Sequence, residues 1–90
     1  MKNLKEIISK NIINLRKANN LTQVELSKMI NYSDKAISRW EKGEVLPDIE
    51  TIQTLSEVFK VPMSAILEDS EDLTKSKLQT VLQAASIIYS

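Results

Sequence analysis

The side chains of this sequence that are best suited to chemistry follow one another at helical spacing between positions 34 and 39. They are Asp34, Lys35, Ser38 and Arg39. If Ile37 and Trp40 face the interior, these four lie on the other side of the same helix, near its start. Lysine and arginine can donate to O6 and N7 of guanine, whereas aspartate can accept only from a donor such as N4 of cytosine. A solvated helix face, with Asp34 stabilising the helix dipole, is the alternative interpretation.

Two missing residue types exclude most other kinds of site. The 90 residues include no cysteine and no histidine. A thiolate metal site is therefore absent, as are the commonest metal ligand and the commonest general base. No carboxylate pair is set in an evident cleft either. The sequence predicts that the protein is not an enzyme and that it binds no cofactor and no metal.

Charge is distributed unevenly along the chain, although the formal net charge is zero. Residues 1–47 carry nine basic and five acidic side chains, and residues 48–90 carry three and seven. A merely solvated surface would usually show an even distribution, so the first half is expected to meet an anion. The length indicates one small domain, and the lack of a long apolar run or secretory signal indicates a soluble, cytoplasmic protein.

The periodicity of the apolar residues predicts the first two helices. One helix is expected from about residue 4 to 18, with an apolar stripe formed by Leu4, Ile8, Ile12 and Leu15. Asn19 and Asn20 then tolerate a left-handed turn. A second helix is expected from 23 to about 30, because Thr22 and Glu25 have the spacing of a capping box. Its buried face would consist of Leu26, Met29 and Ile30.

A third, short helix is expected over about 34–42, with Ser33 as its N-cap and Gly43 at its end. Only Asn31 and Tyr32 lie between the second helix and the Ser33 N-cap. Such a tight connection sets two helices at a large angle, so the second can enter a DNA major groove about 12 Å wide. Two short helices and a turn also occur in bundles that do not bind DNA, so this geometry alone leaves both possibilities open.

The remaining chain is expected to complete a five-helix unit and add a sixth helix. Asp48 is the expected cap of a fourth helix, whose apolar positions are Ile49, Ile52, Leu55, Val58 and Phe59. Pro62 suits the first position of a fifth, two-turn helix. The predicted domain therefore covers residues 1–67, followed by an acidic linker at 68–72 and an amphipathic helix at 73–90.

The last predicted helix carries an apolar stripe that the five-helix core does not obviously need. Its members are Leu78, Val81, Leu82, Ala85, Ile88 and Tyr89. The stripe could dock on its own domain or form a homodimer seam. It could also mark the point at which a longer protein has been truncated. The sequence does not distinguish these three interpretations.

Several motifs, in the right order and at the right spacings, resemble one family. They are Thr22-Gln-x-Glu-Leu26 at the start of the second helix, Ile37-Ser-x-Trp-Glu-x-Gly43 at the end of the third, and Pro47-Asp48 before the fourth. This pattern, from about Ile7 to Leu67, resembles the Cro and phage-repressor type of helix-turn-helix regulator. Asn31 stands where that family most often has glycine, and it is the next residue able to hold the left-handed turn.

The resemblance implies roles for individual side chains. It assigns base contacts to Asp34, Lys35, Ser38 and Arg39. It assigns phosphate contacts to Gln23, Ser33, Lys42 and Gly43. For Gln23 the resemblance also allows a second role, bracing the base-reading residue at the start of the third helix. Arg16 and Glu41 would form a structural salt bridge between the first and third helices.

Residues and resemblance together predict an all-α, repressor-like DNA-binding domain. It would act as a transcriptional regulator, a repressor that binds a palindromic operator in double-stranded DNA as a homodimer. Two alternatives remain open. One is an antitoxin whose C-terminal helix binds a toxin, and the other is a protein-interaction module that keeps the helix-turn-helix scaffold without binding DNA.

Overall fold

The computed structural model describes residues 3–69, which form five helices. They are α1 (Leu4–Ala18), α2 (Gln23–Ile30), α3 (Asp34–Glu41), α4 (Ile49–Phe59) and α5 (Ser64–Leu67). This part of the chain contains no strand, so the expected all-α fold with five helices is confirmed. The predicted sixth helix at 73–90 lies outside the described residues, as does most of the predicted linker at 68–72.

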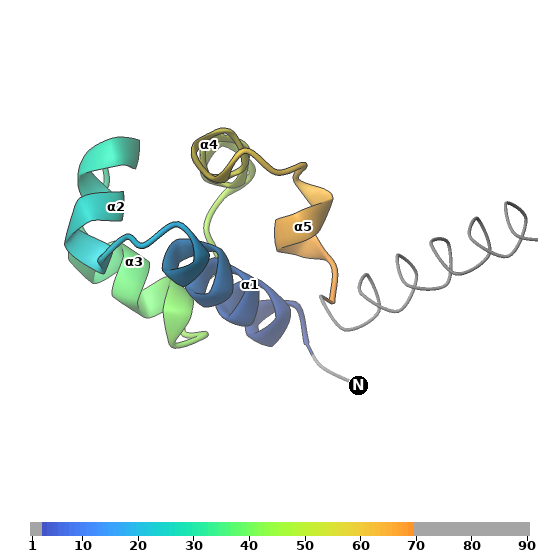
Figure 1. The fold of residues 1–90 in the computed structure, drawn as a ribbon. Coiled ribbons are helices and arrows are strands. Elements are labelled where there is room, and N and C mark those ends of the chain that lie inside the picture. The colour runs from blue at the N-terminus through green and yellow to red at the C-terminus, as the bar shows by residue number, and fades with distance from the viewer. Residues whose placement is uncertain (1–2, 70–90) are drawn as a thin grey trace, which may run out of the picture.

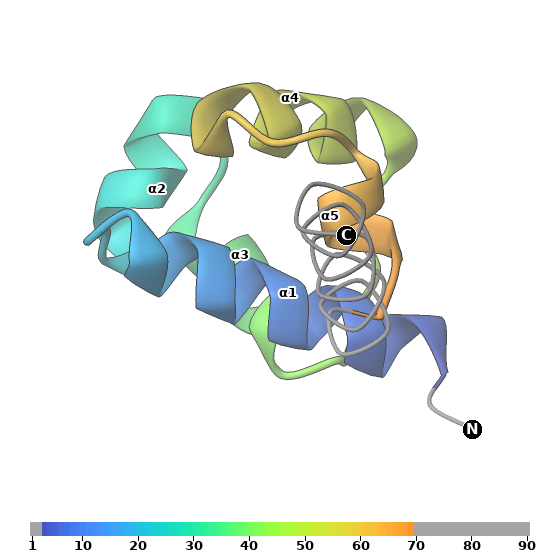
Figure 2. The same cartoon turned by 45° about the vertical axis from the view of Figure 1, so that its right-hand side comes forward.

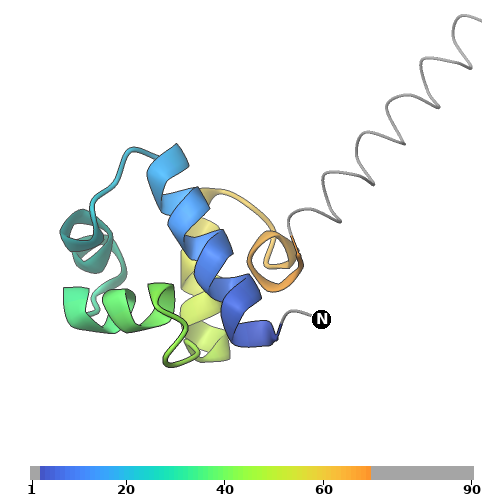
Figure 3. The same ribbon diagram turned by 90° about the horizontal axis from the view of Figure 1, so that it is seen from below.

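The five helices surround one core. Helix α1 contacts both α3 and α5, and α4 contacts α2 and α5. Figures 1 and 2 show α2 and α5 at opposite ends of the space between α1 and α4. The view from below places α2 and α3 together on the side of α1 away from α5 (Figure 3). In these views no other described helix covers the outer side of α2 and α3.

Every helix contributes apolar side chains to this core. The buried set is Ile8, Ile12, Leu26, Ile30, Ile37, Trp40, Ile52, Leu55, Phe59 and Ile66. In α1 to α4 these residues recur at spacings of three or four, which is the period of one helix face. The core therefore consists of one apolar face from each of α1 to α4 and the buried Ile66 of α5, with Leu67 packed against it.

One buried polar residue, Asn11, joins α1 to the end of α5. Its Nδ2 donates to the carbonyl oxygens of Ile66 (2.8 Å) and Glu68 (2.7 Å). The last carbonyls of a helix have no partner within it, so the amide of Asn11 satisfies groups that burial would otherwise penalise. Asn11 thus fixes the short helix α5 on α1.

The helix bounds agree with the sequence prediction for α1 and α2 and differ slightly for the others. Helix α3 ends at Glu41, and Lys42 is its C-cap rather than its last residue. Helix α5 is a single turn from Ser64, not two turns from Pro62. The N–H of Ala65 donates to the carbonyl of Pro62 at 3.0 Å, so a tight turn occupies the place of the predicted first helical turn.

Three residues assigned to apolar stripes are exposed. They are Leu4 (48% exposed), Met29 (55%) and Ile49 (64%). Leu4 and Ile49 are the first residues of their helices and project beyond the core. Met29 lies on the flank of α2, because the buried face of that helix is centred on Leu26, Ser27 and Ile30. The expectation that Met29 is buried was therefore wrong.

Candidate nucleic-acid interface

The connection between α2 and α3 consists of Asn31, Tyr32 and Ser33. Asn31 ends α2 in the left-handed conformation (φ 59°, ψ 43°), and the N–H of Tyr32 donates to the carbonyl of Ser27 at 3.0 Å. The hydroxyl oxygen of Ser33 accepts the N–H of Ala36 at 3.1 Å and so begins α3. The predicted left-handed turn and N-cap are confirmed.

A capping box fixes the other end of α2. The N–H of Glu25 donates to the hydroxyl of Thr22, and a carboxylate oxygen of Glu25 accepts the N–H of Thr22, both at 3.0 Å. The hydrogen bonds from the backbone and hydroxyl of Thr22 lower the pKa of Glu25. Both helices of the motif therefore begin with a side chain that satisfies free backbone N–H groups.

The inner face of α3 packs into the core. Ile37 is fully buried and Trp40 is 5% exposed. The ring of Tyr32 meets that of Trp40 edge-on, with centroids 5.3 Å apart and an interplanar angle of 63°. The hydroxyl of Thr51, on α4, donates to the hydroxyl oxygen of Tyr32 at 2.8 Å. The turn before α3 is thus tied both to α3 itself and to α4.

The carboxylate of Glu41 joins three helices at the end of α3. Oε2 accepts from Arg16 Nε at 2.7 Å, and Oε1 accepts from Arg16 Nη2 at 3.0 Å and from Gln23 Nε2 at 3.1 Å. The backbone carbonyl of Glu41 also accepts the hydroxyl of Ser9. The hydrogen bonds and charge of Glu41 raise the pKa of Arg16 despite its burial. We refer to Arg16, Gln23 and Glu41 as the Glu41 cluster.

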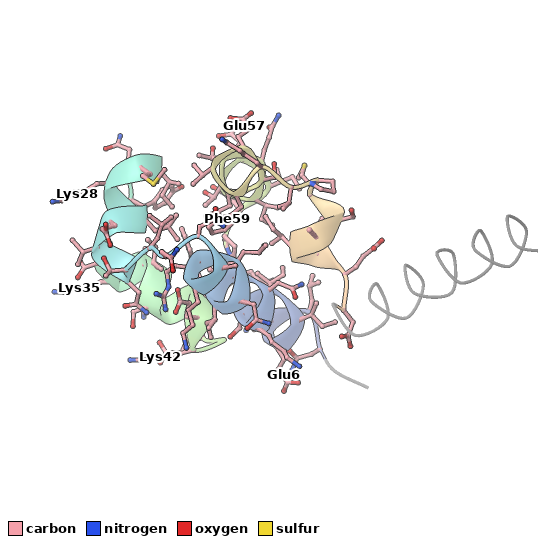
Figure 4. All side chains as sticks on the ribbon, in the orientation of Figure 1. Glu6, Lys28, Lys35, Lys42, Glu57 and Phe59 are labelled. Atoms are coloured by element: carbon pink, nitrogen blue, oxygen red, sulfur yellow. The ribbon has the colours of Figure 1, made fainter. Side chains whose placement is uncertain are left out.

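The outer face of α3 carries charge. Asp34, Lys35 and Arg39 are exposed, and Ser38 is half-buried. Because Ile37 and Trp40 point inward, the side chains of Lys35 and Arg39 project from the opposite side of the helix. Their positions are about 6 Å apart along the helix axis. Figure 4 shows Lys28, Lys35 and Lys42 along the edge formed by α2 and α3.

The end of α3 places an acidic residue beside this face. Gly43 is left-handed (φ 72°), and its N–H donates to the carbonyl of Trp40 at 3.1 Å. The N–H of Glu44 then reaches back to the carbonyl of Arg39 at 3.0 Å, which completes a Schellman motif. The Glu44 carboxylate forms an ion pair with Arg39, with Oε2 and Nε 3.6 Å apart.

A family model decides where the chain belongs. The Helix-turn-helix family model matches residues 12–66, which include α2, α3 and the whole Glu41 cluster. The chain belongs to this helix-turn-helix family. Its type is that of Cro and the phage repressors, as the sequence motifs indicated.

Three known proteins are similar to this chain over most of its 90 residues. It is 34% identical to the HTH-type transcriptional activator BcrR of Enterococcus faecalis over 72% of this chain and 32% of BcrR. It is 29% identical to the cryptic phage CTXphi transcriptional repressor RstR of Vibrio cholerae over 86% of this chain and 69% of RstR. Identity to the antitoxin PezA of Streptococcus pneumoniae is 33%, over 74% of this chain and 42% of PezA. The chain thus spans about a third of BcrR and less than half of PezA.

A solved structure has the same arrangement of helices. The SOS-response transcriptional repressor LexA of Eubacterium rectale superposes with a TM-score of 0.70 at 30% identity. The match covers 73% of this chain and 70% of the LexA chain.

The structure gives Gln23 a protein partner. Its amide donates to Glu41, the last residue of α3, and not to a residue at the start of that helix. Gln23 therefore braces the end of α3, and the expected bracing role at the start of that helix stays a prediction. Because Nε2 carries two hydrogens, this bond is compatible with the predicted phosphate contact.

The other residues assigned to phosphate lie near the two ends of α3. The hydroxyl oxygen of Ser33 is used as a cap acceptor, which leaves its proton for donation. Lys42 is exposed and Gly43 is partly exposed, both directly after α3. Lys28, on the same edge, was not assigned a role from the sequence, although it belongs to the basic first half of the chain. The predicted contacts of these residues stay predictions.

The six residues predicted for a dimer interface, Leu78 to Tyr89, lie outside the described residues. Within residues 3–69, no helix is long and apolar enough to span a membrane. In the same part of the chain, no group of three or more acidic side chains is arranged to hold a metal ion.

Proposed function

We propose that this helix-turn-helix chain is a sequence-specific DNA-binding transcriptional regulator whose helix α3 enters the major groove. The observation that carries the proposal is the pair of cationic side chains, Lys35 and Arg39, on the outer face of α3. The opposite face of that helix is held in the core, and its two ends are fixed by Ser33 and the Glu41 cluster. A rigid helix that presents outward donors suits base reading, because each contact needs a defined geometry.

In the proposed interface, some side chains contact bases and others contact phosphates. Lys35 and Arg39 donate to guanine, Asp34 accepts from cytosine, and Ser38 lies close by. Gln23, Ser33, Lys42 and the backbone of Gly43 contact phosphates and set the register of α3 in the groove. Phosphate contacts release counterions, so affinity falls steeply with salt, whereas a good base contact contributes about 1–3 kcal/mol of discrimination.

The regulator acts as a dimer on a palindromic operator. Two copies of α3 can read half-sites about 34 Å apart, which is one helical turn of DNA. The basic half of the chain carries a surplus of only four positive charges, so a single copy binds phosphates weakly and gains much from a second. The predicted stripe from Leu78 to Tyr89 supplies the two-fold contact in this proposal.

Repression in the cytoplasm is the proposed mode of action. The likeness to RstR and to the LexA structure supports a repressor, and the likeness to BcrR supports regulation of transcription in general. A dimer bound across a promoter would exclude other proteins from the same groove.

Selection from a random duplex library tests the proposal. The bound pool is sequenced at two salt concentrations, and the mass of the protein in solution is determined alongside. We expect an enriched inverted repeat with half-sites one helical turn apart, bound more weakly at the higher salt. No enrichment at either concentration would refute sequence-specific binding.

Single substitutions then test which side chains contact bases and which contact phosphates. Arg39→Ala should relax base preference, with a loss of about 1–3 kcal/mol on the selected operator and little loss on scrambled DNA. Lys42→Ala is the matched control, because loss of a phosphate contact lowers affinity on both duplexes by a similar factor. Equal losses for Arg39→Ala on both duplexes would remove Arg39 from base reading.

A second candidate function is that of an antitoxin, and the likeness to PezA favours it. The same domain would bind DNA while the predicted C-terminal helix binds a toxin. This candidate predicts that a chain shortened after residue 69 keeps its DNA preference as a monomer but no longer retains a toxin. An interaction module that does not bind DNA at all would leave the random library unenriched.

A further inference from the structure

We propose that Glu44 is a positioning residue for Arg39, and that it makes the reading of guanine by this side chain more selective. In the complex with DNA, the carboxylate of Glu44 orients the Nε edge of the guanidinium and leaves the two terminal nitrogens for the base. This inference rests on the proposed function, because it concerns how one base-reading side chain is presented to DNA.

The position of Glu44 relative to Arg39 is set by the backbone. Left-handed Gly43 folds the chain back at the end of α3, and the N–H of Glu44 donates to the carbonyl of Arg39 itself. The two residues are therefore joined by a main-chain hydrogen bond of 3.0 Å as well as by their charges. Any side chain at position 44 starts beside Arg39, and a carboxylate there can reach the guanidinium.

The atoms that meet are the ones that base reading does not need. Arginine has five N–H groups, one on Nε and two on each terminal nitrogen. The ion pair joins Nε to Oε2 of Glu44, whereas the bidentate contact with guanine O6 and N7 uses two N–H groups of the outer fork. A carboxylate on Nε and a guanine on the fork can therefore be bound by the same side chain at once.

The pair is loose before DNA arrives. At 3.6 Å it is longer than a hydrogen bond, and the side chains of Arg39 and Glu44 are 65% and 53% exposed. Water screens such a pair almost completely in the isolated protein. When α3 enters the groove and water leaves, the same charges interact more strongly, so the orienting effect develops in the complex.

Glu44 also acts on binding to the wrong sequence. Its negative charge lies among the phosphate-contact candidates Lys42 and Gly43 and repels the DNA backbone whatever the sequence. In the correct register the carboxylate is compensated by an Arg39 that is also bound to guanine. In any other register the repulsion remains and the compensation is smaller, so Glu44 favours selectivity at a cost in general affinity.

The substitution Glu44→Gln separates these effects, because glutamine keeps the size of the side chain and removes its charge. Affinity is measured for the selected operator, for the operator with the guanine opposite Arg39 replaced, and for scrambled DNA. We expect the preference for guanine to fall by about two- to five-fold, the range of a weak ion pair. Affinity for scrambled DNA should rise, and the thermal unfolding midpoint should stay unchanged.

Two controls make the test specific. Glu57→Gln changes charge equally on α4, away from the edge formed by α2 and α3, and should leave the guanine preference unchanged (Figure 4). In an Arg39→Ala background, Glu44→Gln should no longer alter that preference, because Glu44 acts through Arg39. Glu44→Asp should keep part of the preference for guanine, because it retains the carboxylate that Glu44→Gln removes.

Each contrary outcome has a distinct meaning. A wild-type guanine preference that survives Glu44→Gln unchanged would overturn the role of Glu44 and leave the proposed function standing. The same would follow if the effect of Glu44→Gln persisted without Arg39. A wild-type protein with no preference among duplexes would overturn both proposals.

Discussion

Helix α3 contributes one residue to each of two arginine–glutamate pairs, whose chemistry is the same and whose surroundings differ. Arg16 and Glu41 are 13% and 6% exposed and are joined by two hydrogen bonds of 2.7 and 3.0 Å. Arg39 and Glu44 are 65% and 53% exposed and meet at 3.6 Å. The first pair cannot give up a partner without leaving a desolvated charge, whereas the second can exchange its partner for water or DNA at little cost.

This difference divides the helix into a part that is fixed and a part that can bind. Glu41 holds the end of α3 against α1 and α2, so the outer face keeps one orientation. Arg39 and Glu44, a few residues away, remain available for a second partner. The contrast teaches that burial, more than residue type, decides whether an ion pair supports the fold or serves an interface.

Glu41→Ala should cause the largest effect on stability. It leaves the guanidinium of Arg16 partly buried without its carboxylate and removes the acceptor of Gln23. Fully buried pairs broken in this way cost about 3–5 kcal/mol, and for a pair at the edge of the core we expect about 2–3 kcal/mol. In a thermal melt this corresponds to a fall of roughly 10 °C or more in Tm.

The matched control is Glu44→Ala, which removes the same side chain from the exposed pair. Its effect on the free energy of unfolding should stay within about 0.5 kcal/mol. Equal losses from Glu41→Ala and Glu44→Ala would contradict the contrast between the two pairs.

The caps and turns at the ends of α2 and α3 could be predicted largely from the sequence. Thr22, Asn31, Ser33 and Gly43 each have a strong local preference, and each stands where a cap or a left-handed turn is found. Local patterns of this kind need no knowledge of the tertiary structure. The Arg16–Glu41 pair, in contrast, was expected only from the resemblance, because residues 25 positions apart carry no local signal.

Features that depend on long-range packing were missed. Met29 had the right spacing for burial, but the neighbouring helices pack against the other flank of α2. Helix α4 ends at Phe59, and its C-cap Lys60 is left-handed with a φ of 57°, although it is neither glycine nor asparagine. The link between Gln23 and Glu41 and the placement of Glu44 beside Arg39 likewise become evident only when the helices are assembled.

Gln23→Ala removes the uncharged member of the Glu41 cluster, so it separates the contribution of a neutral hydrogen bond from that of the buried ion pair. Only one hydrogen bond to the carboxylate is lost, and Arg16 keeps its partner. We expect a loss of about 1 kcal/mol in the free energy of unfolding, measured by urea denaturation. If Gln23 also contacts a phosphate, affinity falls by a similar factor on operator and scrambled DNA.

A double-mutant cycle shows whether Gln23 acts through Glu41. In a Glu41→Ala background, Gln23→Ala should cost clearly less than in the wild type, because the acceptor is already absent. Fully additive losses would indicate that the Gln23 amide contributes through some other contact.

The smallest expected effect on stability comes from the exposed carboxylates that accept backbone N–H groups at helix starts. They are exposed like Glu44, but they have fixed hydrogen-bond partners like Glu41. Hydrogen bonds from the Thr51 side chain and backbone lower the pKa of Asp48, and those from Thr22 lower the pKa of Glu25. A carboxyl group with a lower pKa in the folded state stabilises the fold above its unfolded pKa. That contribution is lost as the pH falls through the folded value. Tm should therefore decrease below about pH 4.5.

Glu25→Gln combined with Asp48→Asn tests this explanation, since both new side chains can still cap a helix but do not titrate between pH 6 and pH 2.5. Tm measured over that range should fall less steeply in the double variant than in the wild type. Glu44→Gln is the control, because its carboxylate is exposed and meets only the guanidinium of Arg39 in the ion pair. If Glu44→Gln reduced the fall of Tm with pH as much as the double variant does, the backbone partners of Glu25 and Asp48 could not be the cause of that fall. In that case exposure alone, rather than the kind of partner, would govern how a charge in this fold contributes to stability.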